Sequence, residues 1–224
     1  MFFGIFTIAA RGRLLLALFA TVLSAPAWFA SAQTMEFSPA DMLGWEPKSF
    51  AGDTEYRLVF DRQLQQQVVR ASSRAAASAL FYEQRIDLDA TPWLSWRWRV
   101  ERFPTVTDER VKAGDDFAVR VYVVVRDGWT RLSSKAISYV WAQQAGVGQS
   151  WANPFAGDKA MMLALRNRQD GGGWVSEKRN LKADLRRLFG KDFRYIEAVA
   201  IMTDADNGKG TAIGYYADIA FTKE

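Results

Sequence analysis

Two neighbouring stretches of the sequence alternate strictly between apolar and other residues, and this period of two limits the folds open to the chain. In the first, residues 93–101, the alternate apolar positions are Leu94, Trp96, Trp98 and Val100. In the second, residues 117–125, they are Phe117, Val119, Val121, Val123 and Val125. Successive side chains of a strand point to opposite faces, whereas a helix would spread these residues around its circumference. Both stretches are therefore predicted to be strands, and we expect them to be neighbours in one antiparallel sheet that a second layer covers.

Other segments with the same alternation predict further strands. They cover residues 54–60, 65–71, 72–80, 81–89, 137–142, 159–166, 195–203 and 211–221. Residues 33–50 are expected to form a lead-in in which Trp45 and Phe50 pack against the core, and residues 146–157 a glycine-rich loop. Many short strands at close spacing are typical of a β-sandwich.

One helix is predicted, over residues 181–189. Asn180 is a typical N-cap residue, and Gly190 stands where many helices end in a left-handed conformation. The apolar side chains of this segment share one stripe: Leu181, Leu185, Leu188 and Phe189. The expected fold class is therefore all-β with one short helix, an antiparallel β-sandwich of the jelly-roll kind without a parallel crossover.

Residues 1–32 have the features of a secretory signal peptide. Arg11 and Arg13 precede the apolar run 14–23, and the motif ASA ends at Ala32, after which we expect cleavage. A cut after Ala27 is the alternative site. The apolar run is shorter than the roughly 20 residues that cross a bilayer, so an uncleaved anchor is the less favoured interpretation.

The mature chain, residues 33–224, is accordingly expected to be one periplasmic or secreted domain without membrane contact. Removal of the two arginines leaves 27 basic and 25 acidic residues, a net charge of 27 − 25 = +2. The basic residues are scattered, so the sequence gives no electrostatic sign of nucleic-acid binding. It also holds no signal for an oligomeric state.

The chain contains neither cysteine nor histidine. Their absence excludes disulfides, thiolate nucleophiles, Ser–His and Cys–His catalytic pairs and most zinc sites. Any metal ion would have to be a hard cation bound by oxygen atoms. A binding function without chemistry is favoured, and no catalytic residue is assigned.

Several phrases of the sequence occur in a familiar order. They are LSWRWRV, GDDFAVRVYVVV, ISYVWA, W-x3-KRN followed by FG, and AIMTDADN with GYYADIAF. This set resembles a family of exported bacterial proteins known as domain of unknown function 3047, over a span from Trp45 to the carboxyl terminus. The resemblance implies a jelly-roll sandwich similar to galactose-binding and carbohydrate-binding modules, and it implies no activity.

The polar faces of the predicted strands indicate a ligand surface, provided that the strands are neighbours. Arg and Asp side chains bind hydroxyl or carboxylate groups, and an aromatic ring can stack on a sugar. Tyr216 and Asp218 of the last strand are expected on the same polar face. The predicted ligand-binding residues are Arg97, Arg99, Asp116, Arg120, Tyr122 and Trp141. The partner would be a saccharide or another polar small molecule, and the alternative is a solvated face with cross-strand ion pairs.

Two acidic clusters, Asp115-Asp116 and Asp204-x-Asp206-Asn207, stand where a loop meets a strand. Adjacent carboxylates repel, and Ca²⁺, which takes about 6–8 oxygen ligands, would relieve the repulsion. The candidate ligands of such an ion are Asp115, Asp204, Asp206 and Asn207. The alternative is a local turn in which Gly208 adopts positive φ.

Two other function classes stay open from the sequence. A carboxylate-dependent glycan hydrolase or lyase needs two carboxylates about 5–10 Å apart, which Asp116 with Asp204 or Asp206 could supply, assisted by Tyr122 or Lys112. A structural or interaction protein of the cell envelope would instead expose a large apolar patch.

Overall fold

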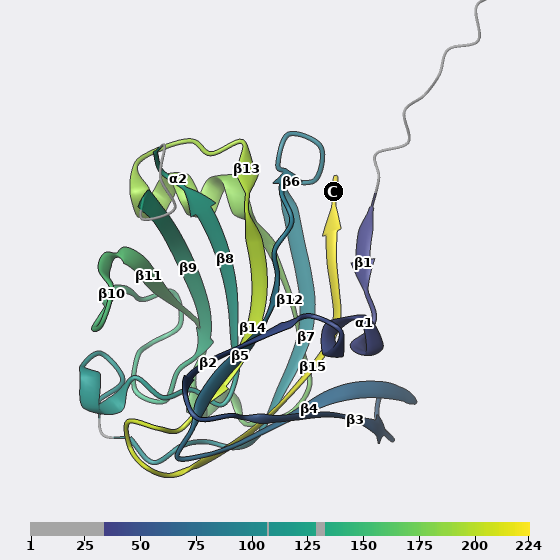
Figure 1. Cartoon of the computed structure of the whole chain (residues 1–224), viewed down its shortest axis with the longest axis vertical. Helices are drawn as coiled ribbons and strands as arrows, with labels where there is room; N and C mark the ends of the chain where they lie inside the picture. Colours follow the sequence, from purple (N-terminus) through teal and green to yellow (C-terminus); the bar gives the residue numbers. More distant parts are fainter. Residues whose placement is uncertain (1–33, 107, 129–132) are drawn as a thin grey trace, which may run out of the picture. The chain divides into compact units, whose positions relative to one another are not determined.

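The computed structural model describes residues 34–106, 108–128 and 133–224 (Figure 1). The predicted signal peptide lies outside these residues. The described residues form two large β-sheets that enclose one main hydrophobic core, together with a small sheet of two strands, so the predicted all-β sandwich is confirmed. No helix within these ranges is both long and apolar enough to cross a membrane.

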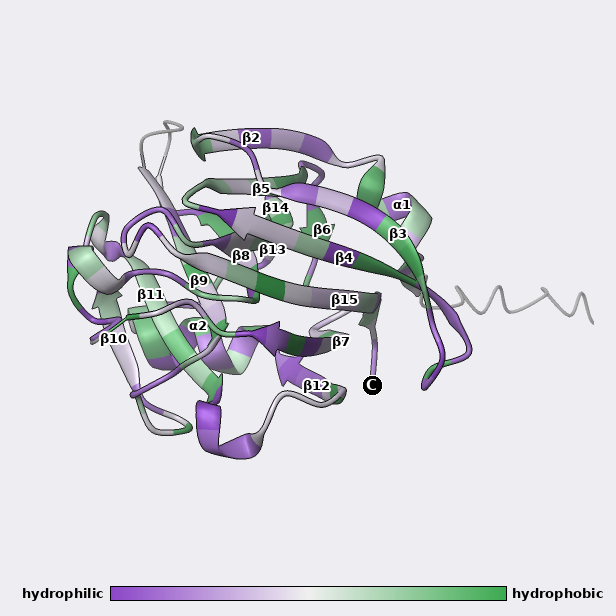
Figure 2. Cartoon of the chain, turned by 90° about the horizontal axis from the view of Figure 1, so that it is seen from below, coloured by the Kyte–Doolittle hydropathy of each residue, from purple (hydrophilic) through white to green (hydrophobic). Residues whose placement is uncertain are grey.

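The first layer, sheet A, has the strand order β12–β7–β15–β4–β3, and β1 also pairs with β15. Figure 2 shows β4, β15, β7 and β12 in succession across this layer. Its pairs are antiparallel, as predicted. The strands are β1 (Met35–Phe37), β3 (Glu55–Asp61), β4 (Gln66–Arg74), β7 (Trp93–Arg102), β12 (Val175–Asn180) and β15 (Thr211–Thr222).

The second layer, sheet B, has the order β10–β11–β9–β8–β14–β5–β2. Its strands are β2 (Glu46–Ala51), β5 (Ala77–Tyr82), β8 (Arg120–Arg126), β9 (Ser134–Trp141), β10 (Ser150–Asn153), β11 (Gly157–Arg166) and β14 (Ala198–Asp204). One pair, β9 with β11, is parallel, contrary to the expected absence of parallel connections. The cause is β10, which forms inside the predicted loop 146–157 and becomes an outermost strand, so that the chain returns as β11 between β10 and β9.

The predicted helix is α2 (Leu181–Phe189), and both of its ends are as expected. Asn180 Oδ1 accepts a hydrogen bond from the Ala183 amide at 3.0 Å, and Gly190 has a φ of 66°. A second, shorter helix, α1 (Pro39–Leu43), was not predicted, although Ser38 and Asp41 cap its start reciprocally. The remaining elements are β6 (Ile86–Asp87), β13 (Tyr195–Ile196) and the 3-10 turns 112–114 and 168–170. Figure 1 shows α2, β6 and β13 at one end of the sandwich.

The core is built from the alternating faces that the sequence predicted. Trp96 and Trp98 of β7 are 1% and 0% exposed, and their rings pack edge to face with centroids 5.3 Å apart. Val121 and Val123 of β8 are equally buried from the other layer. Each layer contributes one apolar face, as in other two-sheet sandwiches.

The expectation that β7 and β8 are neighbours in one sheet is wrong, because β7 belongs to sheet A and β8 to sheet B. The alternation identifies an apolar face but not the layer to which it belongs. Strand β8 also begins at Arg120, three residues later than expected. The Phe117 amide donates to the side chain of Asp204 in β14, at 3.1 Å from Oδ1, and not to a backbone carbonyl of that strand.

Tyr216 was predicted on the polar face of the last strand, and this is wrong because β15 contains a bulge. The pairing of β15 with β7 shifts between Ala217 and Ala220, and Asp218 has a φ of 51°. Such a bulge reverses which residues face inward. Tyr216 is therefore buried in the main core, whereas Asp218 remains on the outer face with Arg97.

The predicted strand 72–80 is divided between the two layers. β4 ends at Arg74, Ala75 has a φ of 45°, and β5 begins at Ala77. β4 belongs to sheet A and β5 to sheet B, so this short turn carries the chain from one layer to the other.

Candidate functional site

A cavity of about 390 Å³ lies on the face of sheet B that points away from the core. Its floor comes from the central strands: Arg120 and Tyr122 of β8, and Met202 and Asp204 of β14. This volume falls in the range of small-molecule sites, about 300–1,000 Å³. The cavity is therefore large enough to hold a small polar ligand or one segment of a longer one.

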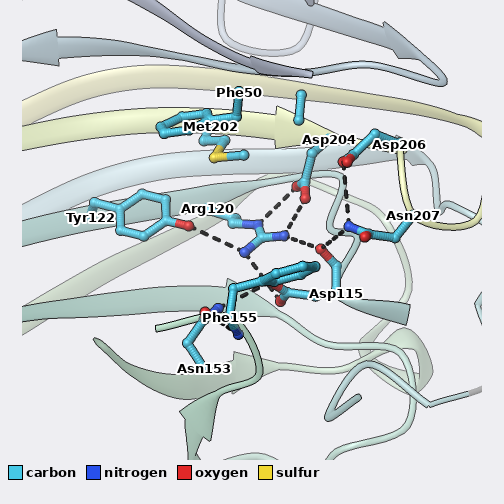
Figure 3. Close-up of a pocket in the computed structure, with 11 residues that line it drawn as sticks. Phe50, Asp115, Arg120, Tyr122, Asn153, Phe155, Met202, Asp204, Asp206 and Asn207 are labelled. Atoms are coloured by element: carbon cyan, nitrogen blue, oxygen red, sulfur yellow. Dashed lines mark hydrogen bonds and ion pairs between the residues drawn. The ribbon is translucent and has the colours of Figure 1, made fainter. Parts of the chain in front are cut away.

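Two exposed phenylalanines from opposite edges of sheet B line this cavity. Phe50 belongs to β2, the outermost strand on one side, and is 62% exposed. Phe155 follows β10, the outermost strand on the other side, and is 58% exposed. Sheet B is thus curved enough for both of its edges to reach one site. Figure 3 shows Phe50 and Phe155 on either side of the Arg120 guanidinium.

The turn that carries Phe155 is fixed by Asn153, a buried residue. Asn153 Oδ1 accepts hydrogen bonds from the amides of Phe155 and Ala156, both at 3.0 Å. Its Nδ2 atom donates to Asp115 Oδ2, also at 3.0 Å. Asn153 therefore links the rim of the cavity to the acidic groups at its floor.

Arg120 is almost completely buried, and every N–H of its guanidinium is used inside the protein. Nε donates to Asp204 Oδ1 at 2.8 Å, and Nη1 donates to Asp115 Oδ1 at 3.3 Å and to the Tyr122 hydroxyl at 3.2 Å. Nη2 donates to the Asp115 carbonyl and to Asp204 Oδ2. A guanidinium has five N–H groups, so none is left for a ligand. The prediction that the Arg120 guanidinium bonds the ligand directly is therefore wrong. This side chain instead positions the carboxylates of Asp115 and Asp204.

Asp116 anchors the loop between β14 and β15. Its Oδ1 accepts from the Asn207 amide at 3.0 Å and from Asn207 Nδ2 at 3.2 Å, and its Oδ2 accepts from the Gly208 amide at 2.7 Å. A Cβ atom on Gly208 would lie 2.7 Å from the Thr105 carbonyl oxygen, so the close approach requires glycine. The positive φ expected at Gly208 occurs one residue later, at Lys209. Asp116 is 0% exposed and does not line the cavity. It therefore supports the loop and is not placed to make the ligand contact that the sequence predicted for it.

The two acidic clusters converge, as a shared site requires. Carboxylate oxygens of Asp116, Asp204 and Asp206 all lie within 4.8 Å of one another. Burial raises the pKa of Asp204 to about 8, against the opposing effect of Arg120. Burial also raises the pKa of Asp115, again opposed by Arg120. Burial and the neighbouring Asp116 raise the pKa of Asp206.

Asp206 differs from the other three carboxylates. It lines the cavity, it is partly exposed, and its carboxylate lies 3.4 Å from Asn207 Nδ2. Within the described part of the chain, Asp206 forms no ion pair with a lysine or arginine. It is therefore the carboxylate that is best placed to bind a ligand.

The predicted calcium ligands Asp115, Asp204, Asp206 and Asn207 are close together, with Asp116 beside them. Both oxygens of Asp204 already accept hydrogen bonds from Arg120, and both oxygens of Asp116 accept from the Asn207–Gly208 backbone. A Ca²⁺ ion would have to compete with these donors for its oxygen ligands. Calcium binding stays a prediction.

Three predicted ligand residues lie elsewhere. Arg97 and Arg99 belong to sheet A, on the opposite side of the core, where Arg97 pairs with Asp218 and the Arg99 guanidinium lies 4.0 Å from the centroid of the Tyr215 ring. Trp141 is 0% exposed in the main core, and its Nε1 donates to the Asn167 carbonyl at 2.8 Å. These three assignments to one ligand face are wrong, because the face was assumed to span β7 and β8.

Sequence reasoning missed the residues that form the walls of the cavity. Phe50 was expected to pack against the core, and a short polar strand such as β2 carries no signal that its aromatic residue is exposed. For Phe155 a signal existed, since the dipeptide Asn153-Pro154 is typical of a turn. It could have placed Phe155 at a turn, but not beside this cavity.

A family model described as a protein of unknown function, DUF3047, matches residues 43–220. The chain belongs to the DUF3047 family. No curated protein matches this DUF3047 chain.

Solved structures with some similarity in fold include a family 30 carbohydrate-binding module from a cellulase of Clostridium thermocellum (TM-score 0.43, 11% identity, 80% of this chain and 94% of the module). A xylan-binding module, CBM86, from Roseburia intestinalis gives a TM-score of 0.34 at 12% identity, over 84% of this chain and 94% of the module. The glycoside hydrolase domain of Endo-D from Streptococcus pneumoniae R6 gives a TM-score of 0.42 at 10% identity; the match covers 80% of this chain but only 22% of that one. None of these likenesses bears on what the DUF3047 chain binds.

Proposed function

We propose that this DUF3047 chain is a non-catalytic binding domain that takes a polar, saccharide-like ligand into the cavity of sheet B. The observation that carries the proposal is the pair of exposed rings, Phe50 and Phe155, which line one cavity together with carboxylate and amide groups. A sugar presents both an apolar ring face and hydroxyl groups. Aromatic walls with a few polar groups suit both parts of such a ligand.

The polar groups divide into those that bind and those that position. Asp206 is free to accept hydrogen bonds from hydroxyl groups, and the Asn207 side chain lies beside it. Arg120 and Asn153 hold the surrounding carboxylates and the Phe155 turn in place. The site is thus built before the ligand arrives, which reduces the entropy lost on binding.

A screen of the mature chain against bacterial envelope and plant polysaccharides, followed by isothermal titration of the hits, tests this proposal. Saturable binding of at least one glycan, reduced when the cavity aromatics are removed, is the expected result. Absence of binding across the panel would contradict the proposal.

A second candidate function is a carboxylate-dependent glycan hydrolase or lyase. Supporting it is the raised pKa of Asp204 beside Asp206 in the cavity lining, since carboxylates with separated pKa values are typical of glycosidase acid–base pairs. Asp116 is buried and does not line the cavity, so the pair would have to be Asp204 with Asp206. Against it, both oxygens of Asp204 are bonded to Arg120. Release of reducing ends or unsaturated products from a bound glycan, abolished in Asp206→Asn, would favour this alternative.

We also propose that the chain is exported to the periplasm or the medium. The basis is the sequence of residues 1–32, with its basic residues, apolar run and small-residue cleavage motif. Amino-terminal sequencing of protein recovered from the periplasmic fraction tests this. A chain that keeps residues 1–32 in the cytoplasmic fraction would contradict it.

A further inference from the structure

We infer that the ligand of this cavity carries a protonated amine, so that the site prefers an amino-sugar glycan to a neutral or anionic one. This inference rests on the proposed saccharide-binding function and names the chemical class of the ligand.

The first argument is the balance of charge beside the cavity. Asp115 and Asp204 share the single guanidinium of Arg120, whereas Asp116 is bonded only to neutral amide donors. Asp206 has no cationic partner among the described residues. Four carboxylates against one guanidinium leave an excess of three negative charges, 4 − 1 = 3, or of two if Asp204 is protonated. An ammonium group would reduce this excess, and a carboxylate or sulfate on the ligand would increase it.

The second argument is where the unpaired carboxylate lies. Asp206 lines the cavity, and its oxygen lies within 4.8 Å of oxygens of Asp116 and Asp204. An ammonium bonded to Asp206 would therefore also be attracted by the carboxylate of Asp116 behind it, and by that of Asp204 when Asp204 is ionised. The low dielectric of the buried cluster makes that attraction stronger than at an exposed surface.

The third argument is the chemistry of the aromatic walls. The face of an aromatic ring attracts cations as well as apolar surfaces. The Lys112 ammonium already lies 5.4 Å from the centroid of the Phe155 ring. Lys112 does not line the cavity, and counting it still leaves the carboxylates in excess. Phe50 and Phe155 can thus contact an amino sugar through its ring face and its ammonium alike.

Oligomers of glucosamine and of N-acetylglucosamine of equal length form the matched pair of ligands that tests the inference, because acetylation removes the charge. An oligomer of galacturonic acid supplies the anionic case. The titration is made at about pH 6.5, where an amine with a pKa near that of an α-amino group is protonated. The glucosamine oligomer should then bind about tenfold more tightly than the N-acetylglucosamine oligomer, a difference of about 1.4 kcal/mol. The galacturonate oligomer should not bind.

The variant Asp206→Asn should reduce the preference for glucosamine to about threefold or less, equivalent to about 0.7 kcal/mol, because it weakens binding of the charged glucosamine oligomer more than binding of the neutral N-acetylglucosamine oligomer. Glu55→Gln, which neutralises an exposed carboxylate on sheet A, is the matched control and should keep the full preference. Equal binding of the two oligomers by the unmodified chain would overturn the amine assignment and leave the saccharide proposal standing.

Two further outcomes separate the proposals. If no glycan of any class binds, the proposed function fails and the amine assignment fails with it. If the N-acetylglucosamine or galacturonate oligomer binds in millimolar CaCl₂ and is released by EDTA, the carboxylates take a divalent cation in place of an amine, and the inference is wrong.

Discussion

Asn153 donates a hydrogen bond to Asp115, with 3.0 Å between Nδ2 and Oδ2, and this bond connects the turn that carries Phe155 to the carboxylates below the cavity. The Oδ1 atom of the same side chain accepts hydrogen bonds from the amides of Phe155 and Ala156. One buried residue therefore fixes both the position of an aromatic wall and the orientation of a carboxylate.

Replacement of Asn153 by alanine should destabilise the protein and weaken ligand binding together. The substitution removes the donor to Asp115 Oδ2 and the acceptor of two turn amides, while Asp115 Oδ1 keeps its bond from Arg120. A buried polar group that stays unsatisfied costs about 1–3 kcal/mol. Urea unfolding measures the first effect and titration with a bound glycan the second. A variant with unchanged stability and affinity would show that the turn does not depend on Asn153.

Replacement of Arg120 by methionine should be among the most destabilising substitutions near the site. It removes the buried cation that compensates Asp115 and Asp204, and loss of one partner of a buried ion pair costs about 3–5 kcal/mol. Arg120→Lys should recover only part of the loss, since an ammonium cannot bond both carboxylates with the same fork. A free energy of unfolding within about 0.5 kcal/mol of the unmodified chain would contradict the structural role of Arg120.

The stability of the protein should fall between pH 5 and pH 8 because of Asp204. Its pKa is raised to about 8 in the folded chain from an ordinary value of 3.8, so in this window the folded state binds more protons than the unfolded state. Stability from this group is complete below the unfolded pKa and is lost as pH rises towards the folded one, by at most about 1.4 kcal/mol per pH unit. Urea unfolding at several pH values should give a shallower slope for Asp204→Asn. Equal slopes would mean that Asp204 titrates normally.

Gly214 of β15 should not tolerate a side chain. A Cβ atom there would lie 2.2 Å from the Ala118 carbonyl oxygen, where the two layers approach closely. Because the obstacle is backbone, Gly214→Ala should cost about 1–3 kcal/mol or more. Gly173→Ala is the matched control, since a Cβ atom at Gly173 would have no neighbour within 4 Å and the stability should change little. Thermal unfolding of the two variants compares them directly, and equal Tm values would contradict the close approach.

The alternation of β7 and the caps of α2 were predictable, because strand periodicity and helix ends depend on residues close in the sequence. The assignment of β7 and β8 to different layers was not, since both patterns look the same whichever sheet contains them. The bulge at Asp218 had no local signal, and it exchanged the inward and outward positions of β15 around Tyr216.

The site was predictable in its chemistry and only partly in its geometry. Asp115, Asp204 and Asp206 stood out as repelling carboxylates, and the fold brings them together. Arg120 was identified by its charge, but a sequence cannot show that a guanidinium uses all its donors on internal acceptors. Phe50 and Phe155 come from opposite edges of one curved sheet, so only the tertiary fold places them at one cavity.

The measurement that tests the account most directly is glycan affinity in Phe50→Ala and Phe155→Ala, alone and combined, with Phe60→Ala as control. Phe60 is 57% exposed but belongs to β3 of sheet A, away from the cavity. Each cavity ring should contribute about 0.5–1.5 kcal/mol, so the double variant should bind at least several-fold more weakly, while Phe60→Ala binds as the unmodified chain does. Equal affinities for all four variants and the unmodified chain would contradict a saccharide site between the two edges of sheet B.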